Sequence, residues 1–326
     1  MRRLILASLV LLVTVPVAAS AQAPVSSEIA ITSAGDQLRG TLLVPARTAR
    51  GAEPVLMLAG SGATDRNGNN IQVSAQPYRL LANALAAPGI TTLRVDKRGI
   101  GGSAAGGHRE EELRVQMFAD DANAWAAELR RRTRARCVWL LGHSEGTMHA
   151  LLAAQTSRDL CGLILLSPAG RRIGDVLRAQ LRGNPANAPL LSEALHDLDE
   201  LEAGRRVSGE GMNPALLQIF RPSVQPFMIS LLAVDPPALA RAWRGRILIV
   251  NGTTDLQTPV ADARALAAAR PGIVLRVIEG MNHVLKLAPA EFNANFATYG
   301  NPDLPLAPEL VDAVTGFILS GQRLPR

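Results

Sequence analysis

Three residue types that can together carry acyl transfer occur in this chain, each just after an apolar run. Ser144 lies in GHSEG, Asp255 in NGTTDLQTP and His283 in GMNHVLK. A serine hydroxyl barely ionises near neutral pH, so a nucleophilic serine needs a base within hydrogen-bond reach. Histidine suits that role, and a carboxylate can fix its tautomer and stabilise its protonated form. The order Ser, Asp, His predicts a nucleophile, an orienting acid and a base.

Each of these residues also has a purely structural interpretation. The glycines at positions ±2 of Ser144 suit a strained turn that presents a nucleophile, but also an ordinary turn in which the serine caps a helix. Asp255 suits a turn, and His283 suits a buried structural histidine. Because all three residues occur together, each after its own predicted strand, the sequence favours a catalytic role for them.

A tetrahedral intermediate needs hydrogen-bond donors for its oxyanion. The backbone N–H of Glu145, directly after the serine, is one predicted donor. The glycine-rich loop AGSGATDRNGN should supply the other, the N–H of Ser61 or, alternatively, of Gly62. No helix follows this loop directly to hold a phosphate, and its spacing fails the dinucleotide fingerprint. We expect Asp65 and Arg66 to brace the loop by a salt bridge.

The elements that position these residues follow from the hydrophobic pattern. Alternating strands and helices predict an α/β fold, with a mostly parallel eight-stranded sheet and helices on both faces. Because the carboxyl ends of parallel strands share one edge, residues distant in sequence can meet there. The expected strands are 28–33, 38–45, 54–60, 90–96, 137–143, 161–168, 246–252 and 273–280, the first two an antiparallel pair. The expected helices are 76–87, 111–132, 145–157, 260–269 and 308–319.

The alternation stops between about 170 and 242. This stretch shows several helical patterns with proline-rich breaks and no strand. We interpret it as a helical lid insertion over the ligand-binding end of the sheet.

The ordered motifs resemble those of the α/β-hydrolase superfamily. The loop GSGxTDRxGN together with GHSEG is similar to bacterial serine esterases related to the serine aminopeptidase branch. The resemblance implies the fold, ester hydrolysis without a cofactor, and the catalytic roles of Ser144, Asp255 and His283. It also implies structural roles for Arg98 and Gly99. Many relatives have a third glycine after the nucleophile motif, where this chain has Thr147, which should tighten the helix start.

The sequence favours a serine carboxylesterase acting on a small-molecule ester, and two alternatives stay open. A serine peptidase or aminopeptidase would need a lid carboxylate to bind the substrate amine. Glu193, Asp197, Asp199 and Glu200 are available, although a solvated helix face explains them better. A binding protein on a catalytically dead hydrolase fold is the other alternative. An epoxide hydrolase or dehalogenase would need an aspartate in place of Ser144.

The remaining histidines are weaker candidates. We expect His143 to pack beneath the nucleophile turn and His149 to lie on the following helix. His108 and His196 fall in a loop and in the insertion, and none of the four has an evident carboxylate partner at a strand end. No cluster of His, Cys, Asp and Glu has metal-ligand spacing, so neither a metal nor another cofactor is expected.

The N-terminus and the cysteines indicate export. Residues 1–21 combine two arginines, an apolar run and an A-x-A site, which predicts a signal peptide cleaved after Ala21 and a mature domain of 22–326. The chain should then be periplasmic or secreted, without a stable membrane anchor. Cys137 and Cys161 are either a disulfide or two buried thiols. The net charge of +6 is scattered and has no basic aromatic stripe, which argues against nucleic-acid binding.

Overall fold

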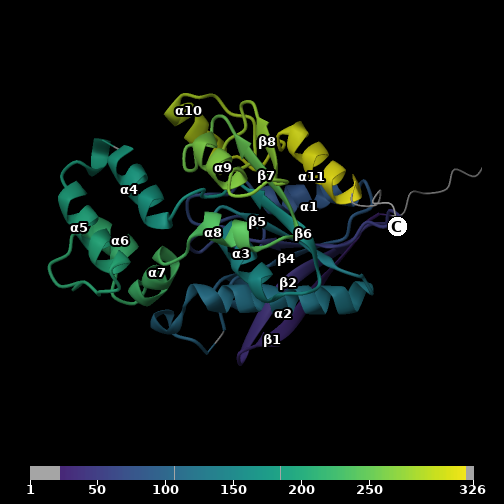
Figure 1. Cartoon of the computed structure of the whole chain (residues 1–326), viewed down its shortest axis with the longest axis horizontal. Coiled ribbons are helices and arrows are strands. Elements are labelled where there is room, and N and C mark those ends of the chain that lie inside the picture. The colour runs from purple at the N-terminus through teal and green to yellow at the C-terminus, as the bar shows by residue number, and fades with distance from the viewer. Residues whose placement is uncertain (1–22, 106, 184, 321–326) are drawn as a thin grey trace, which may run out of the picture.

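A computed structural model describes residues 23–105, 107–183 and 185–320. The predicted signal peptide lies outside the described residues. Within them, eight strands form one sheet in the order β1-β2-β4-β3-β5-β6-β7-β8 (Figure 1). The pairs β1–β2 and β2–β4 are antiparallel, and the other neighbours are parallel. The predicted α/β fold with a mostly parallel eight-stranded sheet is confirmed.

The strands of the sheet lie close to the predicted apolar runs. Their bounds are β1 (Val25–Ser33), β2 (Asp36–Val44), β3 (Val55–Leu58), β4 (Thr92–Val95), β5 (Val138–His143), β6 (Leu160–Leu166), β7 (Arg246–Gly252) and β8 (Val274–Ile278).

Helices fill most of the connections. The helices outside the β6–β7 connection are α1 (Pro77–Ala86), α2 (Val115–Thr133), α3 (Gly146–Thr156), α9 (Val260–Ala267), α10 (Phe292–Ala297) and α11 (Pro308–Ser320). Short 3-10 helices are η1 (Gly101–Ser103), η2 (Glu110–Glu112), η3 (Pro185–Asn187) and η4 (Thr298–Gly300).

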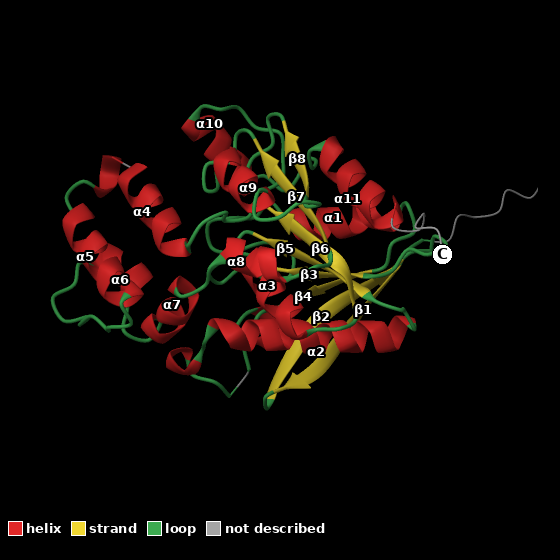
Figure 2. Cartoon of the chain, viewed as in Figure 1, coloured by secondary structure: helices red, strands yellow, loops and turns green. Residues whose placement is uncertain are grey.

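Side chains alternate along the central strands between two apolar cores. On β5, Leu140 faces the core that includes α2, α3 and α9, whereas Trp139 and Leu141 face the core that includes α1 and α11. Figure 2 shows the sheet between these two helical layers. Burial on both faces explains why the central strands read as continuous apolar runs.

All the regular secondary structure described between β6 and β7 is helical. It contains α4 (Ile173–Gly183), α5 (Leu191–Glu202), α6 (Pro214–Phe220), α7 (Gln225–Leu232) and α8 (Pro236–Ala242). Figure 1 shows α4 to α7 grouped beyond one end of the sheet. Their shared core includes Leu198, Leu201, Leu216 and Phe220, all buried. The insertion therefore has an apolar core of its own.

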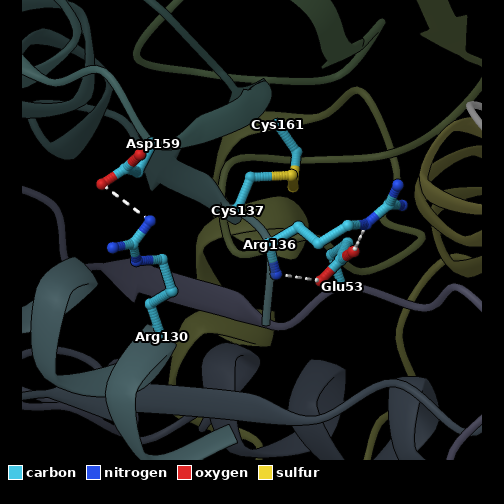
Figure 3. Close-up of a disulfide and its surroundings, with 6 residues drawn as sticks. All are labelled: Glu53, Arg130, Arg136, Cys137, Asp159 and Cys161. Atoms are coloured by element: carbon cyan, nitrogen blue, oxygen red, sulfur yellow. Dashed lines mark hydrogen bonds and ion pairs between the residues drawn. A yellow bond between two sulfur atoms is a disulfide. The ribbon is translucent and has the colours of Figure 1, made fainter. Parts of the chain in front are cut away.

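A disulfide joins Cys137 to Cys161, which is the first of the two alternatives that the sequence left open. The bond, shown in Figure 3, lies where β5 and β6 begin. Ser144 follows directly after the opposite end of β5. Ion pairs flank it, between Arg136 and Glu53 at 2.9 Å and between Arg130 and Asp159 at 2.9 Å.

In the described parts of the chain, no helix combines the length and the apolar character needed to cross a membrane.

Candidate active site

Ser144 occupies a strained turn between β5 and α3. Its φ is +52°, a region that residues other than glycine rarely adopt. A Cβ on Gly142 would lie 2.3 Å from the carbonyl oxygen of Gly146, and a Cβ on Gly146 would lie 2.4 Å from that of Leu58. Close backbone packing therefore requires glycine on both sides of the serine.

The turn does not use Ser144 as a helix cap. The residue at the N-cap of α3 is Glu145, and no side chain caps that helix. Ser144 is held through its backbone instead. Its N–H donates to the carbonyl of Leu166 at 2.9 Å, and its carbonyl accepts the hydroxyl of Thr147 at 2.6 Å. Thr147 thus anchors the first turn of α3, as the sequence predicted.

Asp255 and His283 form a buried pair beyond the ends of β7 and β8. Both carboxylate oxygens of Asp255 lie 3.0 Å from His283 Nδ1. The Asp255 side chain is fully buried, and that of His283 is 6% exposed. Burial alone would raise the pKa of Asp255. The His283 imidazole and the N–H of Thr258 outweigh it and lower that pKa to about 2, so the carboxylate stays charged.

Ser144 and His283 line the same cavity of about 70 Å³, together with Gly60 and Ser61. Because Nδ1 faces Asp255, Nε2 is the nitrogen of His283 that remains for the serine. The described residues show no hydrogen bond between Ser144 Oγ and this nitrogen. Such contacts often tighten only when substrate binds.

The backbone N–H groups of Ser61 and Glu145 are both free for a ligand. Neither donates to any acceptor in the described residues. Both residues line a cavity of about 170 Å³ that also contains Ser144. Gly62 lines a different cavity, which Ser144 does not reach. This placement favours Ser61 over Gly62 as the second oxyanion donor.

The prediction of a salt bridge between Asp65 and Arg66 is wrong. Asp65 instead accepts the N–H groups of Asn67 and Asn69, each at 2.8 Å, and so shapes the loop from within. The Arg66 side chain reaches the sheet, where its Nε donates to Asp96 at 2.9 Å. Adjacent loop residues point in opposite directions here, which a sequence pattern does not reveal.

His143 links three segments of the site beneath Ser144. Its Nε2 lies 2.8 Å from the carbonyl oxygen of His283, so this nitrogen must carry the proton. Its Nδ1 therefore accepts the hydroxyl of Tyr78 at 2.7 Å, and that hydroxyl oxygen accepts the N–H of Gly60 at 3.1 Å. Burial and the neighbouring His283 lower the pKa of His143 to about 3, which keeps it neutral.

One prediction about the other histidines is wrong. His108 Nδ1 lies 2.6 Å from Asp36, the first residue of β2, so it does have a carboxylate partner at a strand end. Arg98 pairs with the same Asp36 and with Asp121, each at 2.6 Å, in keeping with its expected structural role. This network ties the β1–β2 hairpin to α2, and its residues approach in space from distant parts of the sequence.

The sequence also missed a buried charged cluster around Glu145. Lys97 Nζ lies 3.7 Å from Glu145 Oε1, and His149 Nε2 lies 3.6 Å from the same oxygen. His149 stacks on Phe118. The only sequence signals were a charged residue directly after Ser144 and one of just two lysines in the chain.

The acidic residues of α5 do not all form a solvated face. Asp197 is buried, and burial raises its pKa, so the solvated interpretation was wrong for this residue. Asp199 pairs with Arg178 and Glu200 with Arg205. None of these acids lines the cavities next to Ser144. No group of His, Cys, Asp and Glu within the described ranges could hold a metal ion.

Solved structures share this fold. Est1E of Butyrivibrio proteoclasticus, with bound ferulic acid, matches with a TM-score of 0.60 and 16% identity, over 91% of this chain and 100% of that one. A proline iminopeptidase of Mycobacterium smegmatis gives 0.59 and 16%, over 90% and 98%. A thermophilic esterase of Thermogutta terrifontis gives 0.54 and 16%, over 90% and 99%. At this identity, the similarity shows the fold.

A family model described as serine aminopeptidase, S33, matches residues 72–205, a segment that contains Ser144. The chain has the α/β-hydrolase fold. Members with the names esterase and peptidase both occur among its structural neighbours. A comparison with curated proteins gave no match.

Proposed function

We propose that this α/β hydrolase is an exported serine carboxylesterase that acts through an acyl-enzyme. The observation that carries the proposal is the buried Asp255–His283 pair, whose histidine shares a cavity with the strained Ser144 and with Ser61, a residue with a free backbone N–H. A merely structural histidine would not require this combination.

The proposed reaction has two halves. Ser144 Oγ attacks the ester carbonyl while His283 Nε2 takes its proton, and the N–H groups of Ser61 and Glu145 stabilise the oxyanion. The C–O bond to the alcohol breaks, and His283 returns the proton to the leaving alkoxide. Water, deprotonated by His283, then attacks the acyl-enzyme, and Ser144 leaves with the proton. Asp255 holds the imidazole in the tautomer that both halves need.

The charges near Ser144 favour an ester over a peptide with a free amine. Glu110 and Glu145 line the neighbouring cavity of about 430 Å³. Glu110 pairs with Arg221, and Glu145 faces Lys97. Among the described lining residues, each of these carboxylates already has a cation beside it, so neither is left for a substrate ammonium.

The cavity of about 170 Å³ also suits an ester. Apart from Ser144, Ser61 and Glu145, its walls are mainly apolar side chains, among them Met148, Ile173, Val176, Leu177, Met228 and Leu231. Such walls bind an uncharged hydrocarbon group of a substrate and leave few polar groups to recognise a peptide backbone.

Export to the periplasm or the medium is part of the same proposal. It rests on the N-terminal sequence pattern, and the Cys137–Cys161 disulfide supports it because such bonds persist in oxidising compartments.

A fluorophosphonate probe tests the catalytic assignment. We expect the probe to label Ser144 and to abolish hydrolysis of short p-nitrophenyl esters. Ser144→Ala should lose both labelling and turnover, whereas the control Ser157→Ala, outside the site, should keep both. Amino-acid p-nitroanilides should be poor substrates. Faster turnover of the anilides would favour the aminopeptidase, and a folded protein that neither labels nor turns over would favour the binding protein.

A further inference from the structure

Lys97 lies at the carboxyl end of β4 and contacts both segments that supply the proposed oxyanion donors. Its Nζ donates to the carbonyl oxygen of Gly60 at 2.5 Å. The same Nζ lies 3.7 Å from the Glu145 carboxylate, and both side chains are 10% exposed. One buried ammonium group therefore joins the glycine-rich loop to the turn that carries the nucleophile.

The contact with Gly60 fixes the direction of the Ser61 N–H. The carbonyl of Gly60 and the N–H of Ser61 belong to one peptide group, which is planar and trans. The two bonds therefore point in opposite directions. Because Lys97 holds the carbonyl on one side, the N–H must point to the other, and Ser61 lines the cavities that contain Ser144.

The contact with Glu145 acts on the second donor. Glu145 follows the nucleophile directly, and its N–H is the other proposed donor, while its side chain turns away to face Lys97. We propose that Lys97 is a positioning residue that aligns the N–H groups of Ser61 and Glu145 for the oxyanion. This inference rests on the proposed function, because an oxyanion forms only if Ser144 attacks a carbonyl.

A purely structural role explains this pair less well. A buried ion pair costs more desolvation than two apolar side chains of similar size, and its replacement by apolar residues is often neutral or stabilising. Apolar side chains could pack at this position, since Lys97 also lines a small cavity with Leu58, Ala59 and Phe118. The charged pair gives a directional hydrogen bond to Gly60, which an apolar pair could not.

Two variants remove the proposed alignment. Lys97→Met leaves the Glu145 carboxylate buried without its cation and could fail to fold. The double variant Lys97→Met/Glu145→Met removes both charges and keeps the volume, so it should remain folded. Lys286→Met is the matched control, because Lys286 is the other lysine of the chain and its buried side chain also donates to a backbone carbonyl, that of Asn301, at 2.5 Å.

The readout is the ratio of kcat/KM for p-nitrophenyl butyrate to kcat/KM for its thiono analogue. Sulfur accepts hydrogen bonds weakly, so the thionoester gains little from the oxyanion donors. The fraction of active enzyme cancels in this ratio, which makes it insensitive to partial unfolding. In the double variant we expect the ratio and the kcat for the ester to fall roughly 10- to 100-fold, with KM nearly unchanged.

A trifluoromethyl ketone gives an independent measurement, because its serine adduct places an oxyanion between the same donors. Its Ki should rise by the same factor as the ester kcat falls. Lys286→Met should leave both the ratio and the Ki at their wild-type values. A double variant with wild-type ratio and Ki would overturn the inference while the esterase proposal stood. A wild-type protein without ester turnover and without labelling at Ser144 would overturn both.

Discussion

The backbone of Ser144 carries strain that the rest of the site must balance. A non-glycine residue at φ +52° is held there by its hydrogen bond to Leu166 and by the close approach of Gly146 to β3. In return the turn leaves Oγ without a hydrogen-bond partner among the described residues and keeps the N–H of Glu145 available. The same turn therefore produces both the backbone strain of Ser144 and the accessibility of its hydroxyl.

This strain predicts how two substitutions of the serine should differ in stability. Ser144→Ala removes the nucleophile and keeps the strained φ, so its free energy of unfolding should stay near the wild-type value. Ser144→Gly adopts this φ without steric cost, which should make it more stable than Ser144→Ala by about 1 kcal/mol. The greater conformational entropy of glycine in the unfolded chain offsets part of this gain. Urea unfolding measures both. A glycine variant that is less stable than Ser144→Ala by roughly the full 0.5–1 kcal/mol that its unfolded-chain entropy costs would show that the turn is not strained.

At the scale of elements, the pattern of the chain predicts strand ends well and short helices poorly. β7 was predicted at its observed bounds because a buried strand is a continuous apolar run between polar turns. Helix α2 begins at Val115, later than predicted, since Glu110–Glu112 forms a separate 3-10 turn. Helix α10 was missed because its six residues, Phe292–Ala297, are too few to show a helical period.

The disulfide between the starts of β5 and β6 closes the segment that contains the nucleophile and all of α3. With a sequence separation of 24 between its cysteines, loop-closure entropy predicts that reduction lowers the free energy of unfolding by about 3 kcal/mol. Ester turnover at 25 °C should survive, because the bond lies at the opposite end of β5 from Ser144. Urea unfolding of wild type and of Cys137→Ala/Cys161→Ala, with and without reductant, measures the effect. If reduction without urea abolished ester turnover, the disulfide would be needed for catalysis as well as for stability, which would contradict this prediction.

At the scale of the whole molecule, the candidate site assembles from loops that follow β3, β5, β7 and β8. The convergence of Ser144, Asp255 and His283 was predictable because parallel strands present their carboxyl ends at one edge. The contacts of His143 with Tyr78 and His283 were not, and neither was the Lys97–Glu145 pair. Such contacts depend on side-chain directions set by tertiary packing, for which the spacing along the sequence carries no signal.

Two buried histidines near this edge make the stability of the whole fold depend on pH. Burial and His283 lower the pKa of His143 to about 3, and burial and Lys97 lower that of His149 to about 3. In the unfolded chain both titrate near 6.5. Between these values the unfolded state binds protons that the folded state does not, so stability falls as pH drops below about 6.5 and continues to fall toward 3.

With both histidines contributing, the free energy of unfolding should fall by up to about 2.7 kcal/mol per pH unit on acidification between pH 6 and 4.5. Unfolded Glu and Asp titrate at about 4.3 and 3.9, so the slope due to the histidines is best measured above about pH 5, where few carboxylates take up protons. His149→Phe, which preserves the stacking on Phe118, should reduce the slope by about half, and His196→Ala, at an exposed position of α5, should reduce it far less. Urea unfolding at several pH values measures each slope. An unchanged slope in His149→Phe would mean that this histidine is already protonated in the folded protein, with Glu145 as its partner.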